Sequence, residues 1–205
     1  MLDLDHPDLA WCRINDQLIF LDVARDRYFC LPDARNRAVL DRLAGAPDAS
    51  WHQPPAFPLP QDWASPGQSS TAIHDGGFRL TDVARSLWMQ RRVESRLAAD
   101  GFARVLADLR CLLERRTFVL QELSKAGGAT VRAFEHARLL RTAAERCLPR
   151  SIALALCLAS RGDRSHVVLG VRVSPFGAHS WAQQGDTVLN DSLEEVNRYH
   201  PILVV

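Results

Sequence analysis

The second half of the chain contains Cys147-Leu-Pro-Arg-Ser151, then Gly170-Val-Arg-Val-Ser-Pro-Phe-Gly-Ala-His179-Ser-Trp181, and then Val188-Leu-Asn-Asp191. A thiol, an imidazole and a carboxylate therefore follow one another in the order Cys, His, Asp. Each lies close to the end of a predicted helix or strand, where the backbone restricts the position of a side chain. If the fold brings these three side chains together, they can form a catalytic triad.

The first of the three, Cys147, precedes an apolar segment that predicts a helix. This segment covers residues 151–161, and Gly162 after it is a typical C-terminal stop. Cys147 is therefore expected at or just before the helix N-terminus. Unpaired backbone N–H groups and the positive end of the helix dipole favour a thiolate there, and Arg146 and Arg150 add positive charge. This placement predicts a reactive thiol.

His179 and Asp191 lie in a stretch that predicts an antiparallel sheet. Residues 166–173 are β-branched and apolar, residues 178–183 read as the returning strand, and residues 187–190 as a third strand. Turn residues separate the three segments. If the strands share one sheet, His179 and Asp191 come side by side on one face.

These parts predict an α+β fold in which a helical bundle packs on an antiparallel sheet, as in transglutaminase-like and papain-like cysteine peptidases. Asp191 would fix the tautomer of His179, and His179 would take the proton from Cys147. Taken singly, each residue has a plainer interpretation: a core cysteine, a structural histidine and a turn aspartate. Their order and their positions at element boundaries favour a catalytic triad.

The same stretch resembles the B2-type leader peptidases of lasso-peptide maturation. The resemblance covers about the last third of the chain closely, and the family often has Glu where Gln183 stands here. The matching segments are Cys147-Leu-Pro-Arg-Ser151-Ile-Ala-Leu, Leu169-Gly-Val-Arg, Pro175-Phe-Gly-Ala-His179-Ser-Trp181 and Leu189-Asn-Asp191.

The resemblance implies a transglutaminase-like cysteine peptidase with Cys147 as nucleophile, His179 as base and Asp191 as the group that orients the base. The implied substrate is a ribosomally made precursor peptide, cut between leader and core. The cut frees the core α-amine for macrolactam closure by a partner, an asparagine-synthetase-like lasso cyclase. No intrinsic cofactor is implied, and ATP would be required only through that cyclase.

The N-terminal part predicts a small β3-α module, residues 1–48. Residues 9–14, 17–22 and 27–31 read as three strands, and a helix runs from Pro32 to about Leu43. This pattern is similar to the winged-helix-like peptide-recognition domain of ribosomal peptide modification systems, which is itself similar to the small chaperone of pyrroloquinoline quinone synthesis.

In that family a leader peptide adds as a strand to an exposed sheet edge. The resemblance implies that Leu21, Tyr28, Phe29 and Leu31 bind substrate. The alternative is a bare three-stranded meander that packs on the peptidase and binds nothing.

The remaining chain divides into a connector and the peptidase domain. Residues 49–79 are rich in Pro and Gly and predict an irregular segment laid over a surface. Residues 80–205 form the predicted peptidase domain, with helices over 81–100, 102–116 and 130–145. Thr81 is the expected N-cap of the first of these helices. Lys125-Ala-Gly-Gly128 is expected to end the stretch that precedes the helix over 130–145.

Composition excludes several classes of function. A net charge of +1 gives no case for nucleic acid or an anionic membrane. The five cysteines show no zinc-ligand spacing, so we expect no metal, and their odd number fits a reduced, cytoplasmic protein. No apolar run reaches ~18 residues, so no membrane span is expected.

Several alternatives remain at this stage. The same triad serves acyl transfer in transglutaminases and arylamine acetyltransferases, and a non-catalytic adaptor could bind leader with an unused site. A nucleic-acid-binding winged helix is disfavoured by the charge. His200 is the rival imidazole, and His136 is expected to be a bystander. The second oxyanion donor could be Trp181, Gln183 or Arg150.

Overall fold

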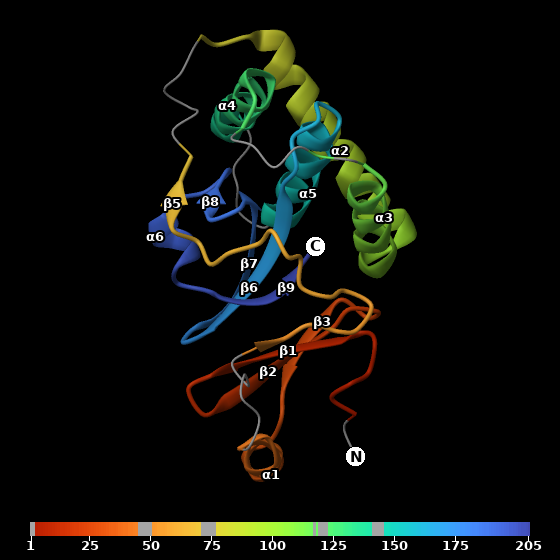
Figure 1. Ribbon diagram of the computed structural model, residues 1–205, viewed down its shortest axis with the longest axis vertical. Coiled ribbons are helices and arrows are strands. Elements are labelled where there is room, and N and C mark those ends of the chain that lie inside the picture. The colour runs from red at the N-terminus through yellow and green to blue at the C-terminus, as the bar shows by residue number, and fades with distance from the viewer. Residues whose placement is uncertain (1–2, 45–50, 71–76, 117, 119–122, 141–145) are drawn as a thin grey trace.

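The computed structural model describes residues 3–44, 51–70, 77–116, 118, 123–140 and 146–205 (Figure 1). Its N-terminal part is a 4-stranded antiparallel sheet with the order β3-β2-β1-β4. One helix lies on the side of this sheet that faces away from the rest of the molecule. The elements are β1 (Leu9–Ile14), β2 (Gln17–Asp22), β3 (Arg27–Cys30), α1 (Asp33–Leu43) and β4 (Trp51–His52).

Strand alternation gives this sheet two apolar faces. Trp11, Phe20 and Phe29 point to one face and form a cluster under α1. Cys12, Ile19 and Leu21 point to the other face and belong to the main core of the protein. The N-terminal sheet is therefore a layer between α1 and the C-terminal region, and it shares its core with that region.

The three predicted strands and the helix are present at the N-terminus. The hairpin turns at Asn15, which adopts the positive φ of 55° that a tight turn requires. Among the described residues before the connector, α1 is the only helix, so a complete winged helix is not confirmed. The predicted boundary of this module at residue 48 lies outside the described residues.

The second sheet has 5 strands in the order β5-β8-β7-β6-β9. Only β5 and β8 are parallel; the other neighbours are antiparallel. β7 lies near the centre, with β6 on one side and β8 on the other. The elements are β5 (Gln68–Ser69), β6 (His166–Val173), β7 (Phe176–Gln184), β8 (Thr187–Val188) and β9 (His200–Val204).

The connector differs from the irregular segment expected, because it supplies β4 to the first sheet and β5 to the second. It is also fixed by side chains: Gln53 Nε2 donates to the Val204 carbonyl at 2.9 Å, and Phe57 is 5% exposed. Its two strands each form the edge of a sheet.

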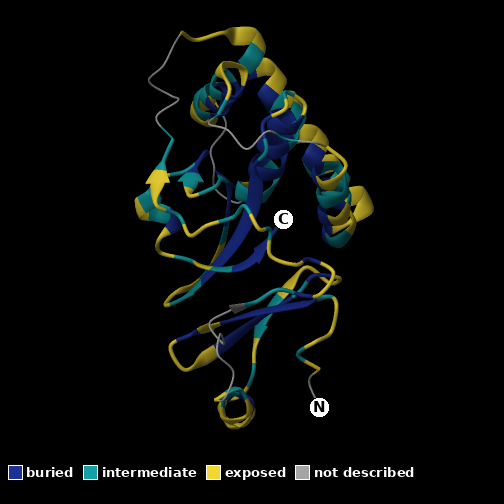
Figure 2. Cartoon of the chain, viewed as in Figure 1, coloured by how far each residue is buried: buried dark blue, intermediate teal, exposed yellow. Residues whose placement is uncertain are grey.

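One helix, α5, is enclosed by the others. It packs against α2 and α4 on one side and against β7 on the other, and Figure 2 shows most of it buried. Its apolar sequence explains this position, because a helix that is apolar all round is stable only when surrounded. The helices are α2 (Leu80–Asp100), α3 (Phe102–Glu114), α4 (Lys125–Leu140), α5 (Cys147–Ala159) and α6 (Leu193–Val196).

Two expected helix ends are wrong. Arg79, not Thr81, occupies the N-cap position of α2, so Thr81 lies inside the helix. Lys125 to Gly128 form the first turn of α4 instead of ending a segment. That helix begins here because the Ser124 hydroxyl accepts the Gly127 N–H at 3.0 Å and donates to Asp163 at 2.7 Å. The predicted end of α4 at Glu145 lies outside the described residues.

Candidate active site

The thiol of Cys147 lies at the first residue of α5, as the sequence predicted. Arg146, in the N-cap position, makes no side-chain capping hydrogen bond. The N–H groups of the first turn therefore have no capping side chain, and they favour an anion at this end of the helix.

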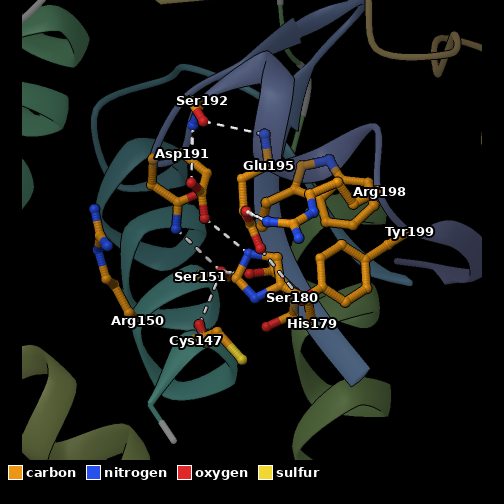
Figure 3. A network of polar contacts seen from close by, with 12 residues as sticks. Cys147, Arg150, Ser151, His179, Ser180, Asp191, Ser192, Glu195, Arg198 and Tyr199 are labelled. Carbon is orange, nitrogen blue, oxygen red and sulfur yellow. Dashed lines mark hydrogen bonds and ion pairs between the residues drawn. The ribbon is translucent and has the colours of Figure 1, made fainter. Parts of the chain in front are cut away.

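The imidazole of His179 is held by Asp191. Their Nε2 and Oδ2 atoms are 2.7 Å apart, and Asp191 also accepts the Ser192 N–H at 2.8 Å (Figure 3). His179 is on β7 and Asp191 follows β8, so adjacent strands bring the two together as expected. Because Nε2 is used by Asp191, Nδ1 is left for the thiol of Cys147, which lies below the ring in Figure 3.

The electrostatics of the three groups favour an ion pair. Burial disfavours a thiolate, but hydrogen bonds from His179 and Ser180 outweigh it and lower the pKa of Cys147 to about 7. Burial also disfavours an imidazolium, but hydrogen bonds with Asp191 and Cys147 raise the pKa of His179 to about 9. Between these values the sulfur is a thiolate and the ring is protonated, which is the reactive form of a Cys–His pair.

A polar network fixes the start of α5 against the sheet. The Ser151 hydroxyl lies 2.9 Å from the Cys147 carbonyl and 3.1 Å from the Ser180 carbonyl, and it accepts a hydrogen bond from Asn190 at 3.0 Å. Asn190 in turn accepts the Ala182 N–H at 2.7 Å. Ser151 and Asn190 lie in the segments that resemble the leader peptidases, but the sequence analysis gave them no role. In the structure they join the elements that carry the thiol, the imidazole and the carboxylate.

Two aromatic rings flank His179. The ring centroid of Trp181 lies 6.2 Å from that of His179, and the ring centroid of Tyr199 lies 5.1 Å away. Gly170 lies opposite His179 in the register of β6 and β7. A Cβ atom at Gly170 would lie 2.8 Å from the Trp181 ring and 2.9 Å from the Tyr199 Cβ atom, so only glycine leaves room for both side chains.

We expect Gly170→Ala to destabilise the protein by about 1–3 kcal/mol, because the added methyl group overpacks a fully buried ring. Urea unfolding followed by tryptophan fluorescence measures this change. Gly77→Ala is the matched control, since a Cβ there has nothing within 4 Å. Equal stability of the two variants would show that Gly170 is not needed for the packing around His179.

The comparison with protein families agrees with this geometry. The model described as "Transglutaminase-like superfamily" matches residues 80–204, which is more than half of the chain. The chain belongs to the transglutaminase-like superfamily. A curated relative, the microcin J25-processing protein McjB of Escherichia coli, is 48% identical over 46 residues, or 22% of this chain and 22% of McjB. The chain therefore matches about a fifth of that relative's length. No match was found among the solved structures.

Within this transglutaminase-like fold, the suggested oxyanion donors are engaged elsewhere. The indole N–H of Trp181 donates to Gln183 at 2.8 Å. Gln183 donates to the carbonyls of Ala64 and Gly185 at 2.6 and 2.7 Å, and it thereby anchors the connector. Arg150 forms an ion pair with Glu135. The backbone N–H groups at the start of α5 remain as candidate donors.

The other histidines that the sequence singled out stay apart from the triad. His200 is exposed on β9, opposite Val171. The His136 ring contacts Phe78, with centroids 5.2 Å apart. Among the described residues, neither forms a hydrogen bond or ion pair with Cys147, His179 or Asp191.

The four residues suggested for leader binding have different surroundings. Leu21 is fully buried in the main core, so its side chain cannot reach a peptide at the sheet edge. Phe29 and Leu31 are half-buried in the cluster under α1. Tyr28 points to the opposite face, where its ring lies 6.0 Å from that of Phe176. β3 is an edge strand, and within the described residues no strand pairs with its outer side.

The described part of the chain has no group of three or more His, Cys, Asp or Glu that could hold a metal ion. It also has no helix long and apolar enough to cross a membrane.

Proposed function

We propose that this protein is a cysteine peptidase that removes the leader from a ribosomally made lasso-peptide precursor. The observation that carries the proposal is the 2.7 Å contact between His179 and Asp191 beside a thiol at a helix N-terminus. A thiolate, a protonated base and an orienting carboxylate are the groups that acyl transfer from a peptide requires.

The reaction follows from the ion pair. The Cys147 thiolate attacks the carbonyl carbon of the scissile peptide bond, and N–H groups at the start of α5 stabilise the oxyanion. As the C–N bond breaks, the imidazolium of His179 gives its proton to the leaving amine. The leader is then joined to Cys147 as a thioester. Neutral His179 next takes a proton from water, whose oxygen attacks the thioester and releases the leader acid and the thiolate.

The substrate class follows from the relative's name, and the partner is our own proposal. McjB is named for the processing of microcin J25, and we extend that role to a precursor of this chain's own. The amine released with the core peptide would be the nucleophile for macrolactam closure. We assign closure to a separate asparagine-synthetase-like cyclase in complex with this chain in the cytoplasm, so ATP would be used by the cyclase.

The β3 edge is the proposed docking site for the leader. An extended peptide paired there would alternate its side chains between the two faces of the sheet. One set would meet Phe29 and Leu31 on the α1 face. The other would meet Tyr28 on the face that packs against the peptidase. This arrangement brings bound leader toward the start of β7, the strand that carries His179.

A polar substitution in the docking site tests the leader proposal. We expect Phe29→Ser to weaken leader binding roughly 10- to 150-fold, since burial of one aromatic side chain stabilises a complex by roughly 1.5–3 kcal/mol. Turnover at saturating precursor should change less. Fluorescence anisotropy of a labelled leader measures the affinity, and Leu59→Ser, at a residue 44% exposed in the connector, is the control. Unchanged affinity in Phe29→Ser would reject this docking site.

Acyl transfer to an amine is the competing reaction, and the superfamily gives it a basis. It uses the same triad and the same thioester but replaces water with an amine acceptor. The mass of the released leader separates the two, because hydrolysis leaves a free carboxylic acid.

A further inference from the structure

A buried ion pair lies directly beside the triad and has no role in the reaction described so far. Arg150 follows Cys147 by about one turn of α5, and it pairs with Glu135 of α4. Their side chains are only 8% and 15% exposed. Figure 3 shows Arg150 projecting from α5 beside Asp191. The pair therefore places a fixed positive charge close to the carboxylate of the triad.

Stability alone gives little reason for this pair. Replacing a buried ion pair with apolar residues of similar size is often neutral or stabilising, because both charges lose their hydration. Both helices contribute apolar residues to the main core, among them Val131, Phe134 and Ile152. Glu135 also lies 3.7 Å from a second, more exposed cation, Arg138. The charge of Arg150, buried beside this core, calls for another explanation.

The electrostatic environment connects Arg150 to the triad. Burial raises the pKa of Asp191, but the hydrogen bond from His179, the Ser192 N–H and the charges of His179 and Arg150 together hold it below the ordinary value. Burial lowers the pKa of Arg150, and the charges of Glu135, Asp191 and Cys147 oppose this by favouring its charged form. Other ionisable groups facing this region are Tyr28 of β3, Glu94 of α2 with its partner Arg146, and His136 and Arg138 of α4.

We propose that Arg150, held in place by Glu135, is a positioning residue for the triad: its charge keeps Asp191 an anion against His179, and so maintains the thiolate of Cys147. This inference rests on the proposed role of Cys147 as nucleophile. Arg150 acts through Asp191 and touches no reacting atom. A purely structural pair would stabilise α4 against α5 without affecting the thiolate.

The test compares charge with packing. Arg150→Met removes the charge, Arg150→Lys keeps it, and Arg150→Met with Glu135→Leu replaces the whole pair by apolar side chains. The rate of Cys147 alkylation by iodoacetamide is followed from pH 5 to 10 with peptide mapping by mass spectrometry. Circular dichroism checks folding. Arg96→Met is the control, because Arg96 is 39% exposed and pairs with Asp100 and Asp108.

We expect the alkylation midpoint to rise by about one pH unit in Arg150→Met and in the double variant, which lowers the rate below the midpoint about tenfold. Arg150→Lys and Arg96→Met should keep the midpoint of the unmodified protein. Two results would overturn the proposal. One is an alkylation midpoint that is the same in Arg150→Lys and Arg150→Met. The other is a folded double variant whose alkylation midpoint equals that of the unmodified protein.

This measurement needs no substrate, so it is separable from the proposed function. If the unmodified protein fails to cut a precursor while the alkylation midpoint depends on Arg150 as stated, the peptidase proposal fails and the positioning role stands. If it cuts the precursor and the midpoint does not depend on Arg150, the positioning role fails alone.

Discussion

Cys147→Ala should abolish release of the leader from a precursor peptide, with a rate reduced by roughly 10⁴-fold or more. Without the sulfur no thioester forms, and no other nucleophile is held against His179 in the described structure. Because Cys147 is only half-buried at the start of α5, its removal leaves the core in place. Chromatography and mass spectrometry of the products measure release, and circular dichroism checks the fold.

Cys111→Ala provides the matched control for this result. Cys111 is also a half-buried free thiol, but it lies on α3, away from the triad. We expect this variant to release leader at the rate of the unmodified protein. Normal release by Cys147→Ala would exclude the thiol mechanism.

His179→Ala should also abolish release, and in addition it should change the thiol itself. The hydrogen bond and the charge of His179 lower the pKa of Cys147 to about 7, whereas burial raises it. Without the ring, the pKa of the Cys147 thiol is set by burial and by the remaining contacts with Ser180, and it should rise by about two units. Alkylation by iodoacetamide at pH 7 should then slow about a hundredfold, since each unit is a tenfold change in thiolate.

The pH dependence of leader release follows from the protonation states of Cys147 and His179. In the unmodified protein the thiolate appears as pH rises through about 7, and the imidazolium is lost as pH rises through about 9. Leader release should therefore follow a bell-shaped curve between these values. His200→Ala is the control, because His200 is exposed on β9. An alkylation midpoint that stays at about 7 in His179→Ala would contradict the ion pair.

Sequence reasoning recovered the elements that carry the triad because their signals are local. The β-branched run at 166–173 gives β6 with its bounds unchanged, and the apolar run after Cys147 gives α5. The contact between His179 and Asp191 followed from placing two strands in one sheet. In these cases the residues that determine an element lie within it.

Features that depend on distant residues were missed. The strands of the connector, β4 and β5, are two residues long each and exist only because β1 and β8 pair with them. The start of α4 depends on Asp163, which is 39 residues from Ser124. A pair of glycines at 127–128 looks like a helix stop in the sequence, yet Gly127 is needed there because a Cβ would lie 2.4 Å from Asp163.

The site shows the same division. Cys147, His179 and Asp191 could be proposed from residue type and position. The pairing of Arg150 with Glu135 could not, because it depends on how α4 packs against α5. The role of Gln183 was also hidden, since its partner Ala64 lies 119 residues away in the connector.

The most direct test of the account is mass spectrometry of a precursor peptide encoded beside this chain, incubated with the protein and its cyclase in water enriched in ¹⁸O. Hydrolysis through Cys147 predicts a core peptide that has lost its leader, and a leader with one ¹⁸O in its new carboxyl group. A precursor that stays intact, or a leader joined to an amine without ¹⁸O, would contradict the account.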